Sequence, residues 1–67
     1  MRLGGTRMGE LLTIEEASAY LKVPVETLRK WRSQDRGPKV AKIGRHLRYR
    51  TDELRRWVRE QERASVA

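Results

Sequence analysis

Backbone-breaking residues divide this chain into short segments. Pro24 cannot continue a helix and disfavours helical geometry at the residue before it. The pair Gly37-Pro38 ends a second segment, and Gly44 marks a turn in the next one. A chain of 67 residues without cysteine must build its core from these short pieces. The sequence therefore predicts one small domain of short helices and strands joined by tight turns.

Two helices are expected in the first half of the chain. Thr13 can serve as the N-cap of the first, and Glu16 lies three residues on, where a capping box requires it. The apolar residues that follow predict a helix over 14–21. After the proline, a second helix is expected over 25–34. Its buried stripe consists of Val25, Leu28 and Trp31. Two short helices joined by a turn of a few residues make a helix-turn-helix arrangement.

The segment 39–50 has the pattern of a β-hairpin whose connection is Gly44-Arg45-His46. Period-two alternation defines an apolar face that consists of Ala41, Ile43, Leu47 and Tyr49. It defines a cationic face that consists of Lys42, Arg48 and Arg50. The hairpin is thus expected to pack its apolar face on the domain and to present its basic residues to solvent.

A third helix is expected to follow an N-cap at Thr51 and to end near Glu62. Its apolar face consists of Leu54, Trp57 and Val58. Trp31 and Trp57 share the helical spacing of the apolar residues, so both are expected in the core and not as platforms for stacked bases. The expected fold class is mainly α with a small β-hairpin, a winged helix-turn-helix of three helices plus a two-stranded wing.

Positive charge is concentrated in one part of the chain. Residues 22–50 hold ten lysines and arginines against two acids, a net charge of +8, and the remaining residues carry six basic and seven acidic groups, or −1. The two values add to the formal net charge of +7. A charge imbalance confined to one segment is typical of proteins that bind a polyanion.

Duplex DNA is the polyanion that this pattern favours. The major groove admits one helix, and residues 25–34 carry side chains able to form paired hydrogen bonds with base edges. The expected contacts in this helix are Glu26, Thr27, Arg29, Lys30 and Arg32. The expected contacts in the hairpin are Lys42, Arg45, Arg48 and Arg50. Arg45 is placed at the hairpin tip, where it can enter an adjacent minor groove. The alternative interpretation of both sets is a solvated surface that binds nothing.

Catalytic residues, metal sites and cofactors are not expected, so the chain is interpreted as no enzyme. It has no cysteine, and its single histidine, His46, stands at the hairpin tip without a carboxylate near it in sequence. Tyr49 lies in an arginine-rich segment, as a nucleophile for DNA cleavage would, but its alternation with Ile43 predicts a packed position. The chain lacks an apolar run of signal-peptide or membrane-span length, so a membrane is not an expected partner. With no catalytic constellation in the sequence, a small-molecule substrate is not expected either.

The chain resembles the excisionase and MerR-type winged-helix family over about residues 11–60. The motifs that carry the resemblance are Leu12-Thr-Ile-Glu-Glu-Ala17, Tyr20-Leu21, Glu26-Thr-Leu-Arg-Lys-Trp31, Gly37-Pro38, Lys42-Ile-Gly-Arg45, Leu47-Arg-Tyr-Arg50 and Asp52-Glu-Leu-Arg-Arg-Trp57. It implies groove-reading roles for Glu26, Thr27, Arg29 and Lys30 and a wing-tip role for Arg45. One departure is Pro24-Val25, where many relatives have Ser-Pro, so the side-chain cap of the second helix is missing.

A freestanding domain of this kind resembles phage and mobile-element excisionases, also called recombination directionality factors. That resemblance implies cooperative homo-oligomers on bent DNA, an integrase as partner, and a cytoplasmic location in a bacterial or phage-infected cell, with nucleoid association when bound. The expected organisation is a flexible N-terminal arm (1–10), the DNA-binding domain (11–62) and a frayed C-terminal tail (63–67). A small MerR-like transcriptional regulator is the first alternative, and an RNA-binding or protein-interaction module is the second.

Overall fold

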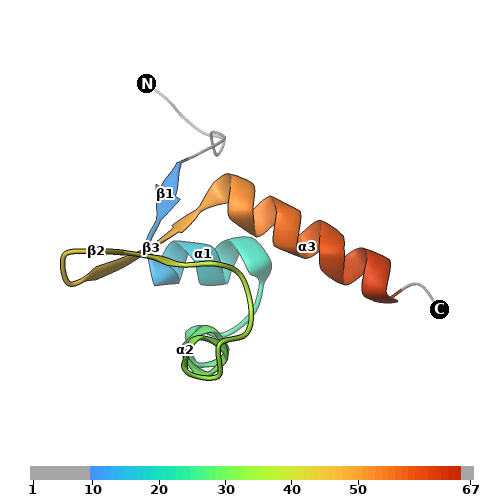
Figure 1. Cartoon of the computed structure of the whole chain (residues 1–67), viewed down its shortest axis with the longest axis horizontal. Coiled ribbons are helices and arrows are strands. Elements are labelled where there is room, and N and C mark those ends of the chain that lie inside the picture. The colour runs from blue at the N-terminus through green and yellow to red at the C-terminus, as the bar shows by residue number, and fades with distance from the viewer. Residues whose placement is uncertain (1–9, 66–67) are drawn as a thin grey trace.

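The computed structural model describes residues 10–65, so nearly all of the expected N-terminal arm lies outside the described residues. The elements in chain order are β1 (Leu11–Leu12), α1 (Ile14–Leu21), α2 (Val25–Ser33), β2 (Ala41–Ile43), β3 (His46–Arg50) and α3 (Thr51–Ser65). Figure 1 shows the hairpin of β2 and β3 and the long helix α3 projecting from opposite ends of the body. Three helices and a small antiparallel sheet confirm the predicted fold class.

Helix α1 begins and ends where its sequence predicts. The Thr13 hydroxyl accepts the Glu16 N–H at 3.1 Å, and the Glu16 carboxylate accepts the Thr13 N–H at 2.8 Å, which completes the capping box. Lys22 ends the helix in the left-handed conformation, with φ 59°. Helix α2 then begins directly after Pro24, which supplies no side-chain cap. The two helices therefore form the expected helix-turn-helix.

A short strand before α1 was not foreseen. The strand order is β1-β3-β2, and β1 pairs with β3 through Leu11↔Arg50 and Leu12↔Tyr49. Next to this pairing, Thr51 is the first residue of α3, and its hydroxyl accepts the Glu10 N–H at 3.1 Å. These contacts fasten the start of the described chain to the junction of β3 and α3. Helix α3 continues to Ser65, three residues past its expected end, so the first part of the expected frayed tail is helical.

The predicted faces of the hairpin were wrong because its turn is one residue shorter than expected. Ile43 pairs with His46, so the connection is the two-residue turn Gly44-Arg45 and His46 belongs to β3. Of the two turn residues only Gly44 has positive φ, 63°, as in a type II′ turn. A shift of one residue exchanges the faces of β2. Ala41 and Ile43 are exposed on the side of Arg48 and Arg50, and Lys42 lies opposite Leu47 on the other side.

The core takes one buried hydrophobic residue from each of five elements. These residues are Leu12 of β1, Ala17 of α1, Leu28 of α2, Tyr49 of β3 and Leu54 of α3. Tyr49 is the largest of them and is only 1% exposed, so the prediction that it packs under the hairpin is confirmed. Burial raises the pKa of its hydroxyl, and the charge of Arg32 offsets part of that rise.

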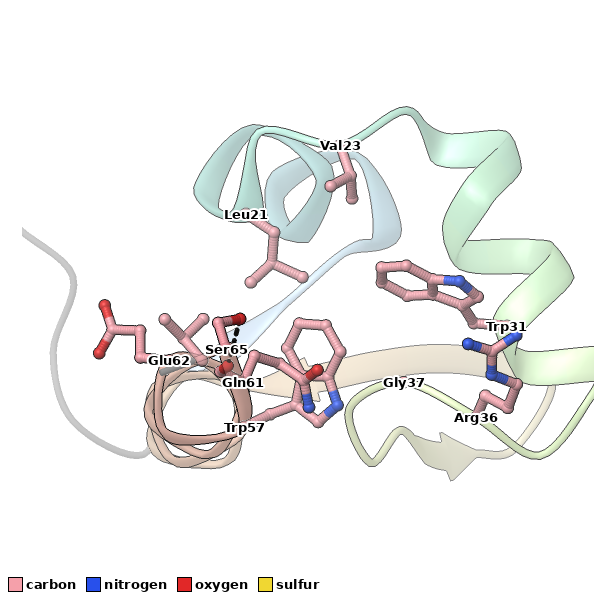
Figure 2. Close-up of a pocket in the computed structure, with 10 residues that line it drawn as sticks. Leu21, Val23, Trp31, Arg36, Gly37, Trp57, Gln61, Glu62 and Ser65 are labelled. Atoms are coloured by element: carbon pink, nitrogen blue, oxygen red, sulfur yellow. Dashed lines mark hydrogen bonds between the residues drawn. The ribbon is translucent and has the colours of Figure 1, made fainter. Parts of the chain in front are cut away.

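The two tryptophans are half-buried, so neither belongs to the fully buried core, although Trp31 packs against that core as predicted. Their ring centroids are 5.3 Å apart, and the rings are tilted by 48°. They line a groove of about 680 Å³ between α2 and α3. Figure 2 shows Leu21 directed into this groove from the end of α1. Trp31 thus joins the back of α2 to α3 and leaves the other side of α2 uncovered.

Trp31 also fixes the loop that leads from α2 to the hairpin. Gly37 lies against its indole ring with φ 80°, and a Cβ added there would stand 2.9 Å from Trp31 Cε3. The Arg36 N–H donates to the Trp31 carbonyl at 2.7 Å, and Pro38 is buried. The loop is therefore held by packing as well as by backbone hydrogen bonds.

Replacing Gly37 by alanine is expected to destabilise the fold more than the same change at Gly44. Both positions have positive φ, which costs a non-glycine residue about 1–2 kcal/mol. Only Gly37→Ala adds a collision with Trp31, since nothing lies within 4 Å of a Cβ at Gly44. Overpacking of this kind adds about 1–3 kcal/mol. Urea unfolding followed by circular dichroism measures the difference, and equal effects of the two substitutions would contradict the role given to Trp31.

Candidate nucleic-acid interface

One side of α2 carries exposed polar and charged residues. Leu28 is 1% exposed and faces the core. With 3.6 residues per turn Glu26 and Lys30 fall on the opposite side and Arg29 lies next to them, about 100° from Leu28, and all three are exposed. Thr27 lies on one flank of the helix and is half-buried. The structure thus brings together three of the five predicted helix contacts on a single outward side.

Arg32 occupies the other flank of α2. It is exposed, but the helical period places it between the outward side and the buried Leu28. Burial raises the pKa of the Tyr49 hydroxyl, and Arg32 lies near enough for its charge to offset part of that rise. Arg32 therefore lies toward the sheet and the loop after α2, away from the centre of the side that carries Lys30.

The hairpin places its predicted contacts in different surroundings. Arg45 occupies the turn at the tip and is exposed. Lys42 is exposed on the side of the hairpin that Leu47 shares. Arg48 is half-buried, and its guanidinium donates to the Leu47 carbonyl at 2.8 Å. Lys42 and Arg45 are therefore exposed cations of the hairpin, whereas Arg48 is partly covered.

Arg50 is paired with an acidic residue. Its Nε lies 3.3 Å from the Asp52 carboxylate, and this hydrogen bond lowers the pKa of Asp52. Across residues 10–65 the other salt bridge joins Arg56 to Glu53, both in α3. Of the ten basic residues between positions 22 and 50, Arg50 is thus the one that forms a salt bridge within the described part of the chain. In the same part of the chain the remaining nine positive charges are uncompensated by carboxylates.

Two exposed cations near α2 were not among the predicted contacts. Arg36 and Lys39 flank the Gly37-Pro38 pair in the loop between α2 and β2. The charge count of the segment included them. Arg36 lies outside every predicted helix and strand, and Lys39 stands at the start of the expected hairpin, where the alternation assigned it no place on the cationic face.

Other kinds of site find little support in the described residues. Between positions 10 and 65 no three histidine or acidic residues gather where they could hold a metal ion. The hydroxyl-bearing ring of Tyr49 is enclosed, so it does not present a nucleophile to a DNA strand. None of the described helices combines the length and the apolar character that crossing a bilayer requires.

Comparison with known proteins agrees with this geometry. Residues 11–62 match the family model described as helix-turn-helix domain. No curated protein and no solved structure matches the chain significantly. The matched region begins at β1 and includes both helices of the turn, the hairpin and most of α3. The chain therefore belongs to the helix-turn-helix domain family, whose members bind DNA.

Proposed function

We propose that this protein is a sequence-specific, DNA-bending excisionase that directs an integrase toward excision. Helix α2 enters the major groove, and the hairpin follows the adjacent minor groove. The observation that carries the DNA-binding part is the outward side of α2, where Arg29 and Lys30 are exposed and form no salt bridge within residues 10–65. Side chains in this state can reach base edges without first breaking an internal ion pair.

The side chains on α2 have the chemistry that base reading needs. Arg29 and Lys30 can each donate to guanine O6 and N7, and Glu26 can accept from the amino group of cytosine. Thr27, half-buried on the flank, is placed for a thymine methyl group or a phosphate. Arg45 at the hairpin tip suits a narrow minor groove, whose negative potential attracts a guanidinium.

The excisionase role rests on the resemblance of the ordered motifs to that family, and bending gives it a physical basis. Bending a site of ~20–30 bp by 40–90° costs on the order of 1–6 kcal/mol. One domain of this size offers few contacts with which to offset that cost. Several copies bound side by side share it through many phosphate contacts and through contacts between neighbours. An integrase then meets its sites already bent.

Arg29→Ala and Lys30→Ala are expected to weaken binding to a specific site much more than binding to random duplex. Each well-placed pair of base contacts discriminates by about 1–3 kcal/mol, whereas removal of the charge acts on every duplex alike. Dissociation constants are measured on a duplex enriched from a random pool and on its scrambled sequence. Arg59→Ala, which removes the same charge from exposed α3, is the matched control. Equal weakening on both duplexes for the α2 variants would refute base reading by this helix.

Asp52→Asn is expected to tighten binding to every duplex by about two- to fivefold. The substitution releases Arg50 from its 3.3 Å ion pair, an exposed interaction that stabilises the fold only weakly, so the guanidinium becomes available to a phosphate. Glu60→Gln removes the same charge elsewhere on α3 and serves as control. A tightening no larger than that of the control would show that Arg50 lies outside the interface.

Recombination with the cognate integrase tests the proposed role directly. The protein is expected to raise excision and to lower integration on supercoiled substrates that carry the element's attachment sites. Electrophoresis of circularly permuted fragments measures the accompanying bend, which should decrease for Arg45→Ala. An unchanged ratio of excision to integration refutes the excisionase role, and repression of a promoter in its place would assign the protein to the transcriptional regulators.

A further inference from the structure

A second hollow lies beside the C-terminal end of α2. Its volume is about 270 Å³, and its charged lining residues are Arg32, Arg36, Lys39 and Asp35. The three cations come from the last turn of α2 and from the loop that leads to β2. We refer to these three residues and the hollow between them as the loop cradle. A net charge of +2 at one small concave site is a surface suited to an anion.

The cations of the loop cradle are not neutralised by the described residues. None of them forms a salt bridge within residues 10–65, and Asp35 does not pair with any of the three. The Arg36 guanidinium donates a long hydrogen bond, 3.4 Å, to the neutral amide oxygen of Gln34. Neighbouring like charges repel one another, and a bound anion would remove that repulsion. The site therefore favours a ligand that brings negative charge and several acceptor oxygens.

The backbone of the loop cradle is fixed without a ligand. Gly37 rests on the Trp31 ring, Pro38 is buried, and the Arg36 N–H is bonded to the Trp31 carbonyl. The Asp35 N–H donates to the Arg32 carbonyl at 3.1 Å, which closes the end of α2. A site whose backbone is already ordered loses less conformational entropy when it binds.

We propose that the loop cradle binds one phosphate of the DNA backbone, the one that lies between the two grooves occupied by α2 and the hairpin. This inference rests on the proposed function. The cradle stands on the connection between these two elements, from Ser33 to Ala41. If one element lies in the major groove and the other in the adjacent minor groove, the strand that separates the grooves must cross this connection. The guanidinium groups of Arg32 and Arg36 match phosphate oxygens, and Lys39 adds a point charge.

Asp35 is the feature that limits phosphate affinity at the cradle. Its carboxylate lines the same hollow and repels an incoming anion. It has positive φ, 59°, a conformation that asparagine also tolerates well. Asp35→Asn is thus a well-matched variant that changes the charge of the cradle and retains the shape of the side chain. It should bind every duplex several-fold more tightly, and by more than Glu60→Gln does.

The principal test is the double variant Arg36→Gln/Lys39→Gln. Its affinity should fall by about tenfold, or about 1.4 kcal/mol, equally on specific and scrambled duplex, because hydrogen bonds from charged groups to one phosphate are lost whatever the sequence. The slope of log K against log[salt] should decrease in magnitude by about 1, because one phosphate fewer is neutralised on binding. Arg55→Gln/Arg59→Gln on α3 removes the same charge and should leave the slope nearly unchanged. Circular dichroism and urea unfolding verify that all variants fold alike.

Neutral methylphosphonate linkages locate the phosphate on the DNA. Introduced one at a time, they should weaken wild-type binding at a backbone position between the grooves and have no further effect there on the double variant. The loop cradle is overturned if methylphosphonates weaken the wild-type protein and the double variant equally at every position, or if the salt slope of the double variant equals that of wild type. Either result leaves the proposed function intact. If the double substitution weakens binding to duplex RNA of the same sequence but not to the DNA, the loop cradle is overturned as well. If the wild-type protein binds no duplex DNA, the proposed function itself has failed.

Discussion

The fold depends on a cluster of five buried side chains, Tyr49 and one from each of four other elements. The Tyr49 ring is 1% exposed, and its strand β3 pairs with β1 on one side and β2 on the other. Leu28 and Leu54 attach α2 and α3 to the same cluster. In so small a domain each of these five elements is held by one buried hydrophobic residue, and β2 contributes none. The position of α2 relative to the hairpin is consequently set by the packing of Leu28 and Tyr49 in a common core.

The helices and the fold class were predictable because their signals are local. A capping box at Thr13 and a proline at position 24 fix the ends of α1 and the start of α2 within a few residues of chain. The exposed side of α2 was equally predictable, because it lies opposite the buried Leu28. Strand β1 has only two residues and no period to detect. It exists because Leu12 pairs with Tyr49, which is far away in sequence.

The hairpin shows why part of the site could not be predicted. Gly44 can open either a two-residue or a three-residue connection, and the sequence is compatible with both. The structure has the shorter one, so Lys42 and Arg48, expected on one face, lie on opposite faces. Arg50 was expected to be available to a phosphate, but Asp52 engages it from the first turn of α3. Such pairing depends on where a strand ends and a helix begins.

The uncompensated charge links stability to binding. Between positions 22 and 50 nine basic residues form no salt bridge with any described residue, so their mutual repulsion opposes the compact state of a domain whose core cluster holds only five buried hydrophobic side chains. A polyanion that binds the folded state adds its binding free energy to the free energy of unfolding. The charges that weaken the free protein are therefore the same charges that stabilise it on a duplex. A carboxylate partner for each of them would make the isolated domain more stable, and it would remove the electrostatic attraction on which binding to DNA depends.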